Sequence, residues 1–250
     1  MQAMGGMRTA VRRVLAAGLA VVALMLGPGA AASAGASTFP PAGGGEAYGT
    51  AYGELRHLLL ESEFGAPRGR IIRWATSPRV GVIGARAEDR AHIAGLMAEI
   101  SDLWRGTGLA MVPVEPDAAD FLVVFAPGPA LPAVARDFGV PYLPGNDGFA
   151  VPAYDRASFT IRRAVVLIDA NLRGWRRRAT LVQEFVQALG ITTDNPGRPE
   201  SIFFEKGDFS STATAMSAHD RAVLRLLYRR LKPGDGRLAL WIAYQMHWPE

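Results

Sequence analysis

One short stretch of the chain places a carboxylate beside two amides at a spacing that suits metal-binding helices. Gln183, Glu184 and Gln187 fall in the segment TLVQEFVQALG, which runs from Thr180 to Gly190. Residues four apart lie on the same face of a helix, so the side chains of Gln183 and Gln187 are expected to point the same way. Two histidines there would hold zinc, and the adjacent glutamate would activate a zinc-bound water. Amides are not among the usual protein ligands of zinc, so we predict no bound metal and no other cofactor.

The spacing follows the H-E-x-x-H-x-x-G-x-x-H pattern of metzincin-type zinc proteases. Glu184 and Gly190 stand where that pattern has its glutamate and glycine, whereas both of the first two histidine positions hold glutamine. The third ligand position holds Thr193, and Asp194 follows one residue later. Glu184 is the candidate catalytic residue as a general base, or else a hydrogen-bonding relic of the site. The candidate binding residues of the remnant cleft are Gln183, Gln187 and Asp194.

A wider set of residues carries a family resemblance. Its segments are Ile72–Trp74, Ala119–Asp120, Glu184–Gly190, Ser201–Phe203, Asp220 and Leu224–Tyr228. Together they resemble an uncharacterised exported bacterial family, the domain-of-unknown-function family 2927, over residues 70–234. The resemblance implies a zincin-like fold. The loop at 201–203 is also similar to the one that carries the Met-turn in matrixin-type proteases, with Phe203 where the methionine would stand.

Hydrophobic periodicity predicts the elements that must position these residues. An apolar stripe at helical spacing is formed by Leu181, Phe185, Val186 and Leu189. Taken alone, this stripe also fits a core helix with a polar edge and a glycine stop. Strands are predicted at 121–125 and 164–168, and Pro152 predicts that the strand at 149–154 lies at a sheet edge. The order of the elements indicates an α+β fold, a zincin-like mixed sheet with a long helix that carries the degenerate motif.

The first 34 residues have the features of a secretory signal peptide. Arg8, Arg12 and Arg13 precede the apolar run Val14–Leu26, and Ala32–Ala34 is a small-x-small cleavage signal. The apolar run is about 13 residues, shorter than the roughly 20 that span a bilayer. We therefore predict cleavage after residue 34, export to the periplasm or the extracellular space, and no stable membrane span afterwards.

The remaining chain divides into three predicted parts. Residues 35–47 are rich in Gly, Ala, Ser and Pro and are expected to form a flexible linker. Residues 48–236 form the predicted zincin-like α+β domain. Residues 237–250 form a C-terminal tail that we expect to pack on the domain, with docking to a partner as the alternative.

Composition narrows the function classes. The chain has no cysteine, which excludes disulfides. Three of its 27 lysines and arginines lie in the predicted signal peptide, so the rest of the chain has 24 basic and 23 acidic residues. This near balance of charge does not indicate nucleic-acid binding. The basic run Arg173–Arg178 is predicted to be a solvated start of a helix, with an anionic surface beside Trp175 as the alternative. The sequence has no P-loop and no G-x-S-x-G motif.

Three hypotheses about function follow. The first is a non-catalytic exported domain that binds an envelope protein or a cell-wall component. The second is a peptidase-like hydrolase that uses Glu184 with an atypical metal or with none. The third is a purely structural envelope protein.

Overall fold

The structure is a computed structural model of the 250-residue chain. It describes residues 50–62, 68–142, 144–207 and 209–248. The predicted signal peptide and the predicted linker both lie outside the described residues.

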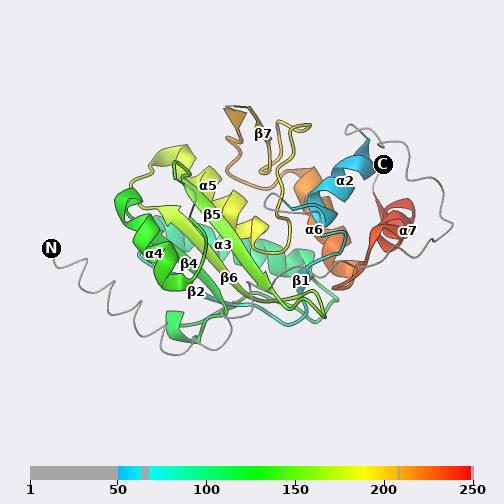
Figure 1. The fold of residues 1–250 in the computed structure, drawn as a ribbon, viewed down its shortest axis with the longest axis horizontal. Helices are drawn as coiled ribbons and strands as arrows, with labels where there is room; N and C mark the ends of the chain where they lie inside the picture. The colour runs from blue at the N-terminus through cyan, green and yellow to red at the C-terminus, as the bar shows by residue number, and fades with distance from the viewer. Residues whose placement is uncertain (1–49, 63–67, 143, 208, 249–250) are drawn as a thin grey trace, which may run out of the picture.

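A central sheet organises the described part of the chain (Figure 1). Its strands are β1 (Arg73–Trp74), β2 (Arg79–Ile83), β3 (Val112–Pro113), β4 (Phe121–Ala126), β5 (Gly148–Tyr154) and β6 (Thr160–Asp169). The strands β1, β6, β4, β2 and β3 follow one another in that order, and neighbours pair in parallel. Strand β5 pairs with β6 alone and is antiparallel to it. The predicted mixed sheet is therefore confirmed, and so is the edge position of the strand that contains Pro152.

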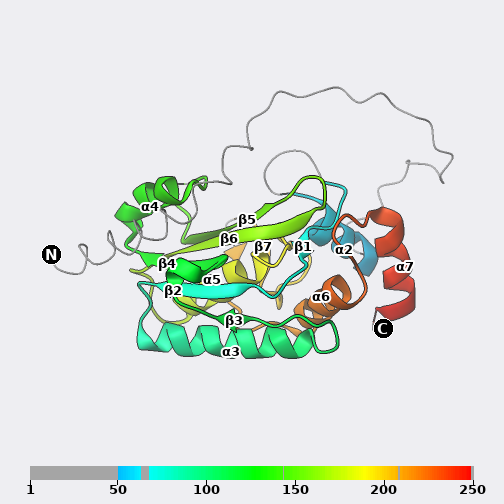
Figure 2. The same cartoon turned by 90° about the horizontal axis from the view of Figure 1, so that it is seen from below.

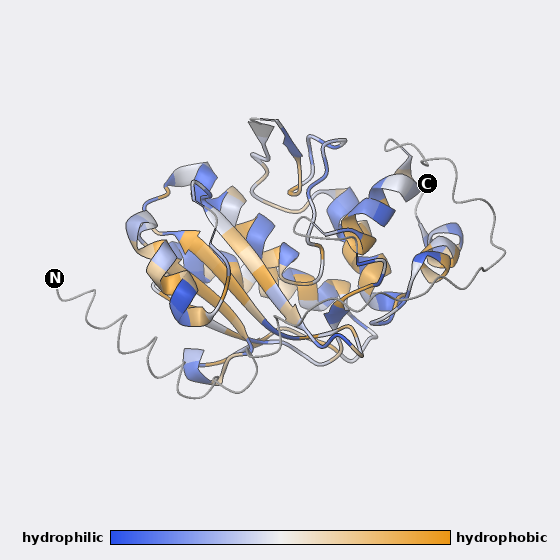
Figure 3. Ribbon diagram, viewed as in Figure 1, coloured by the Kyte–Doolittle hydropathy of each residue, from blue (hydrophilic) through white to orange (hydrophobic). Residues whose placement is uncertain are grey.

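Strand β4 is buried along its whole length because both faces of the sheet are covered. Phe121, Val123 and Phe125 enter the larger of two hydrophobic clusters, and Leu122 and Val124 enter the smaller one on the other face. A parallel strand that is covered on both faces needs a continuous apolar run rather than an alternating one. Figure 3 shows the central strands as the most hydrophobic part of the ribbon.

Helices cover both faces of the sheet. They are α2 (Ala51–Leu60), α3 (Ala87–Leu103), α4 (Leu131–Phe138), α5 (Gly174–Gln187), α6 (Ala218–Arg229) and α7 (Arg237–His247). Helix α4 packs on the smaller cluster, and residues of α2, α3, α5, α6 and α7 belong to the larger one. Figure 2 shows α4 and α3 on opposite sides of the sheet. None of the helices in the described part of the chain is long and apolar enough to cross a membrane.

Several short elements complete the described chain. They are the 3-10 helices η2 (Pro116–Ala118) and η3 (Gly128–Ala130) and the strands β7 (Glu205–Lys206) and β8 (Phe209–Ser210). The last two form a separate two-stranded antiparallel sheet. They lie in the long connection between α5 and α6.

The long motif helix is confirmed as α5, and its apolar stripe, which continues to Leu189 in the turn after the helix, is buried. Leu181, Phe185, Val186 and Leu189 are each at most 1% exposed. The ring of Phe185 lies 4.7 Å from that of Phe121 on β4, which seats the helix against the sheet. The helix begins at Gly174, earlier than the motif segment, and its first turns also bury a side chain, that of Arg177.

Candidate ligand-binding site at the end of helix α5

Helix α5 presents Gln183 and Gln187 shortly before a tight turn. The turn residue Gly190 has a φ of 113°, and a Cβ atom there would lie 2.2 Å from the carbonyl oxygen of Ile72. Only glycine tolerates both the left-handed backbone and so close an approach. The turn brings the following residues back alongside the helix, where Asp194 meets both glutamines.

Two hydrogen bonds anchor the chain on either side of Asp194. The hydroxyl of Thr193 donates to the carbonyl oxygen of His57 on α2 at 3.0 Å. The backbone amide of Asn195 donates to the carbonyl oxygen of Phe203 at 2.6 Å. Asp194 is therefore held from both neighbours rather than carried on a loose loop.

The fully buried Asp220 in turn fixes the loop that contains Phe203. Its carboxylate accepts hydrogen bonds from the hydroxyl of Ser201 at 2.6 Å and from the amide of Ile202 at 3.1 Å. It also accepts one from the amide of Ser217 at 2.8 Å, which is part of a capping box at the start of α6. One buried carboxylate thus ties the 201–203 loop to the first turn of α6.

The structure brings three of the sequence-predicted residues together. The side-chain nitrogens of Gln183 and Gln187 each donate to Oδ1 of Asp194, both at 3.3 Å. We call these three residues the polar cluster. The motif pattern placed the third ligand position at Thr193, but that residue is 3% exposed and its hydroxyl is turned to α2. Because Thr193 serves as an anchor, the next residue takes the place that faces the helix.

The polar cluster does not fit a zinc ion. An ionised carboxylate only accepts hydrogen bonds, so each glutamine must present its NH₂ group to Asp194. An amide nitrogen in that role offers no lone pair, and zinc binds imidazole, thiolate and carboxylate. Across the residues that the structure describes, no three His, Cys, Asp or Glu side chains gather as a metal site.

Glu184, the candidate general base, is buried. It is 8% exposed, and its Oε2 atom is shielded from solvent. A general base must come within hydrogen-bond reach of the proton that it takes from a substrate. The burial of Glu184 leaves little of its carboxylate open to such a contact.

Two aromatic side chains outside the motif hold the end of α5 in place. The indole nitrogen of Trp74 donates to the carbonyl oxygen of Ala188 at 3.2 Å. The hydroxyl of Tyr228 donates to the carbonyl oxygen of Leu189 at 2.8 Å. These carbonyls follow the last helical turn, where partners within the helix are missing. Trp74 and Tyr228 belong to the segments that carry the family resemblance, but neither was predicted to hold the helix. Their polar tips, on aromatic residues that are otherwise apolar, were the available signal.

Arg73 stabilises the end of helix α6, the helix that carries Tyr228. Its buried guanidinium donates to the carbonyl oxygens of Leu227, Tyr228 and Leu231 at 3.1, 2.8 and 2.7 Å, where α6 ends. It also lies 4.5 Å from the centre of the Tyr228 ring. Burial lowers the pKa of Arg73. A cation at the carboxyl end of a helix complements the helix dipole.

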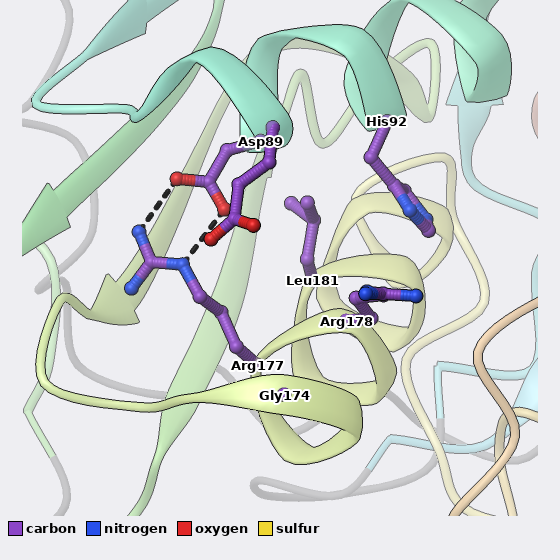
Figure 4. Close-up of a pocket in the computed structure, with 7 residues that line it drawn as sticks. Asp89, His92, Gly174, Arg177, Arg178 and Leu181 are labelled. Carbon is purple, nitrogen blue, oxygen red and sulfur yellow. Dashed lines mark hydrogen bonds and ion pairs between the residues drawn. The ribbon is translucent and has the colours of Figure 1, made fainter.

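A small cavity of about 40 Å³ lies between α3 and the start of α5 (Figure 4). Asp89 and Arg177 form a buried ion pair on one side of it, with both N–O distances 2.7 Å. His92 and Arg178 line the other side; burial and then the charge of Arg178 lower the pKa of His92. A cavity of this size holds a water molecule or so and not a substrate.

The prediction that the run Arg173–Arg178 is solvated is wrong for Arg177, which is 2% exposed because it pairs with Asp89.

Comparisons with known proteins place the chain in a family. A search of curated proteins finds no match to the sequence. Among solved structures, the chain is similar to the structure of myroilysin, with 12% sequence identity and a TM-score of 0.37 over 65% of this chain and 97% of that one. The model of the family described as a protein of unknown function, DUF2927, matches residues 54–237, which include the polar cluster and the residues that support it. The chain therefore belongs to the DUF2927 family, as its sequence resemblance indicated.

Proposed function

We propose that this protein is a non-catalytic exported module that binds an envelope protein or a cell-wall component through the polar cluster. The observation that carries the proposal is the pair of hydrogen bonds from Gln183 and Gln187 to one oxygen of Asp194. Two positions that would bind metal in a zinc protease, together with the residue after the third, here form a hydrogen-bonded group with both donors and acceptors.

The exposure of the cluster suits a ligand that forms hydrogen bonds. Gln183 and Asp194 are partly exposed, whereas Gln187 is buried. A ligand amide or hydroxyl can donate to the carboxylate of Asp194, and the glutamine carbonyls can accept from it. Peptide and sugar groups both have this chemistry. Charge complementarity with a strongly ionic ligand is not required.

The chemistry of the side chains at the metal-binding positions argues against hydrolysis. A zinc-bound water is a strong nucleophile at neutral pH because the ion lowers the pKa of the water. Two amides and one carboxylate do not form the three-ligand set on which such a site depends. Glu184 would then have to activate an ordinary water from a buried position.

Zinc binding by designed variants tests the non-catalytic assignment. We expect the wild type to bind no stoichiometric zinc. The variant Gln183→His/Gln187→His should gain zinc affinity, because Asp194 Oδ1 lies 3.3 Å from both glutamine nitrogens and would complete a three-ligand set. Adding Asp194→Ala to that variant should remove the gain. Tight stoichiometric zinc in the wild type would refute the assignment and favour the hydrolase.

Sedimentation with insoluble cell-wall material tests the binding role. We expect the exported protein to co-sediment and Asp194→Ala to weaken binding, because the ligand loses its acceptor. The matched control is Asp102→Ala, which removes an exposed carboxylate whose side chain is 66% accessible and pairs with Arg105. Equal binding by both variants would exclude the polar cluster as the contact site.

A further inference from the structure

Helix α7 is apolar on two opposite faces. Its Leu240 and Ala243 are buried against the domain. Of the six large hydrophobic side chains that are exposed in the described residues, four belong to α7: Leu238 at 59%, Trp241 at 41%, Ile242 at 49% and Met246 at 68%. At 3.6 residues per turn these four lie on one side of the helix, opposite the buried pair. A helix with apolar side chains on two opposite faces is normally covered on both.

These four side chains, which we call the exposed stripe, lie beside packed aromatic rings. The ring of Tyr52 on α2 meets Trp241 edge-on at 4.9 Å and Tyr244 at 5.4 Å. Tyr244 also lies 6.2 Å from Trp248. Figures 1 and 2 show α7 at one end of the molecule, beyond α2 and α6. The stripe is therefore held at the surface by packed aromatic rings.

Positive charge gathers at the start of α7. From residue 221 to residue 248 the chain has six arginines and lysines and one acidic residue, Asp235. Three exposed cations, Arg70, Lys232 and Arg237, lie at or next to the turn that leads into α7. Arg70 is placed there by a hydrogen bond from its guanidinium to the carbonyl oxygen of Gly234 at 3.4 Å. Helix α7 itself has no acidic residue.

Two other occupants of the stripe fit less well. A second copy would need about 800 Å² per partner for a stable interface, whereas the four side chains expose roughly half of that area. The chain between the predicted cleavage site and α2 offers only Phe39 and Tyr48 as large apolar side chains. Apolar groups beside cations, with tryptophan and tyrosine between them, match the interface of an anionic bilayer.

We propose that α7 docks the protein on the surface of a membrane that contains anionic lipids. The stripe enters the headgroup region, and the cations at the start of the helix contact lipid phosphates. Aromatic rings with polar tips are stable at that depth. The surface uses none of the residues of the polar cluster, so it is independent of the ligand proposed above.

Vesicle co-sedimentation tests this proposal on protein purified after export, with its N-terminus determined by mass spectrometry. The probes are vesicles of phosphatidylcholine with and without phosphatidylglycerol. We expect binding to the vesicles with phosphatidylglycerol, a blue shift of the tryptophan fluorescence, and weaker binding in high salt because salt screens the charges.

Variants separate the contributions of the stripe and the cations. Ile242→Gln/Met246→Gln should reduce the partition coefficient at least tenfold, and Leu238→Gln serves if that variant does not fold. Val112→Gln, which removes an exposed apolar side chain from β3 at 38% exposure, should leave binding unchanged. Arg70→Gln/Lys232→Gln should weaken binding only to the anionic vesicles.

Two results would overturn the proposal. One is that the wild type binds no vesicles, or binds them no better than the stripe variants do. The other is a concentration-dependent dimer of the wild type, in analytical ultracentrifugation, that the stripe variants abolish, because the stripe would then bind a second copy.

Discussion

Replacing Asp89 by asparagine should strongly destabilise the fold. Asp89 is 4% exposed and Arg177 is 2% exposed, and two N–O contacts of 2.7 Å join them. The substitution leaves the guanidinium of Arg177 buried without a balancing charge. Removing one partner of a buried ion pair costs about 3–5 kcal/mol, because the remaining charge keeps its desolvation penalty.

The contacts that remain place the expected loss near the lower end of that range. Arg177 still donates to the carbonyl oxygen of Ala170 at 2.9 Å and lies 4.6 Å from the ring centre of Phe125. Asparagine can also accept one hydrogen bond through its remaining oxygen. We therefore expect a loss of about 3 kcal/mol, which corresponds to a fall in Tm of about 6–12 °C for a chain of this size.

Urea denaturation followed by circular dichroism measures this loss against a matched control. Asp147→Asn removes the ion-pair partner of Arg176. Arg176 lies on α5, as Arg177 does, but its side chain is 61% accessible. An exposed pair contributes about 0–1 kcal/mol, so the control should change stability little. A loss below about 1 kcal/mol for Asp89→Asn, or equal losses for both variants, would refute the role given to the buried pair.

Four further outcomes are expected. Burial acts to raise the pKa of Asp89, but hydrogen bonds and charge from Arg177 and Arg86 outweigh it and hold the pKa below its ordinary value. The stabilisation by the Asp89–Arg177 pair is therefore present above about pH 4 and is lost as the pH falls through the pKa of Asp89 in the folded protein. The difference in stability between wild type and Asp89→Asn should accordingly narrow in urea titrations at acid pH. Phe185→Ala should cost about 3–5 kcal/mol through lost burial and a cavity, and a thermal shift of a degree or less would contradict the core position of α5. Gly190→Ala should cost more than about 1 kcal/mol, since its Cβ would meet a backbone oxygen at 2.2 Å; unchanged denaturation would contradict this. N-terminal sequencing of exported protein should give a start between residues 31 and 37, and an intact first methionine would contradict the signal peptide.

Local rules made several features predictable from the sequence. The buried stripe of α5 follows from a periodicity of 3.6 residues, and the capping box at Ser217 follows from a side chain that reaches an amide three residues away. The edge position of β5 follows from Pro152, which lacks a backbone donor. Each of these depends on contacts within one element or on the chemistry of one residue.

Tertiary structure decided which polar residues meet. The sequence presents Arg173–Arg178 as one basic run, yet Arg177 is buried because Asp89, 88 positions earlier, lies opposite it. The spacing of the motif points to Thr193, yet Asp194 faces the glutamines because Thr193 is bonded to His57, 136 positions away. The family segments around Trp74 and Tyr228 are far apart in sequence, yet both reach the end of α5. Such pairings depend on how helices and strands pack against one another, and periodicity and spacing within one segment do not contain that information.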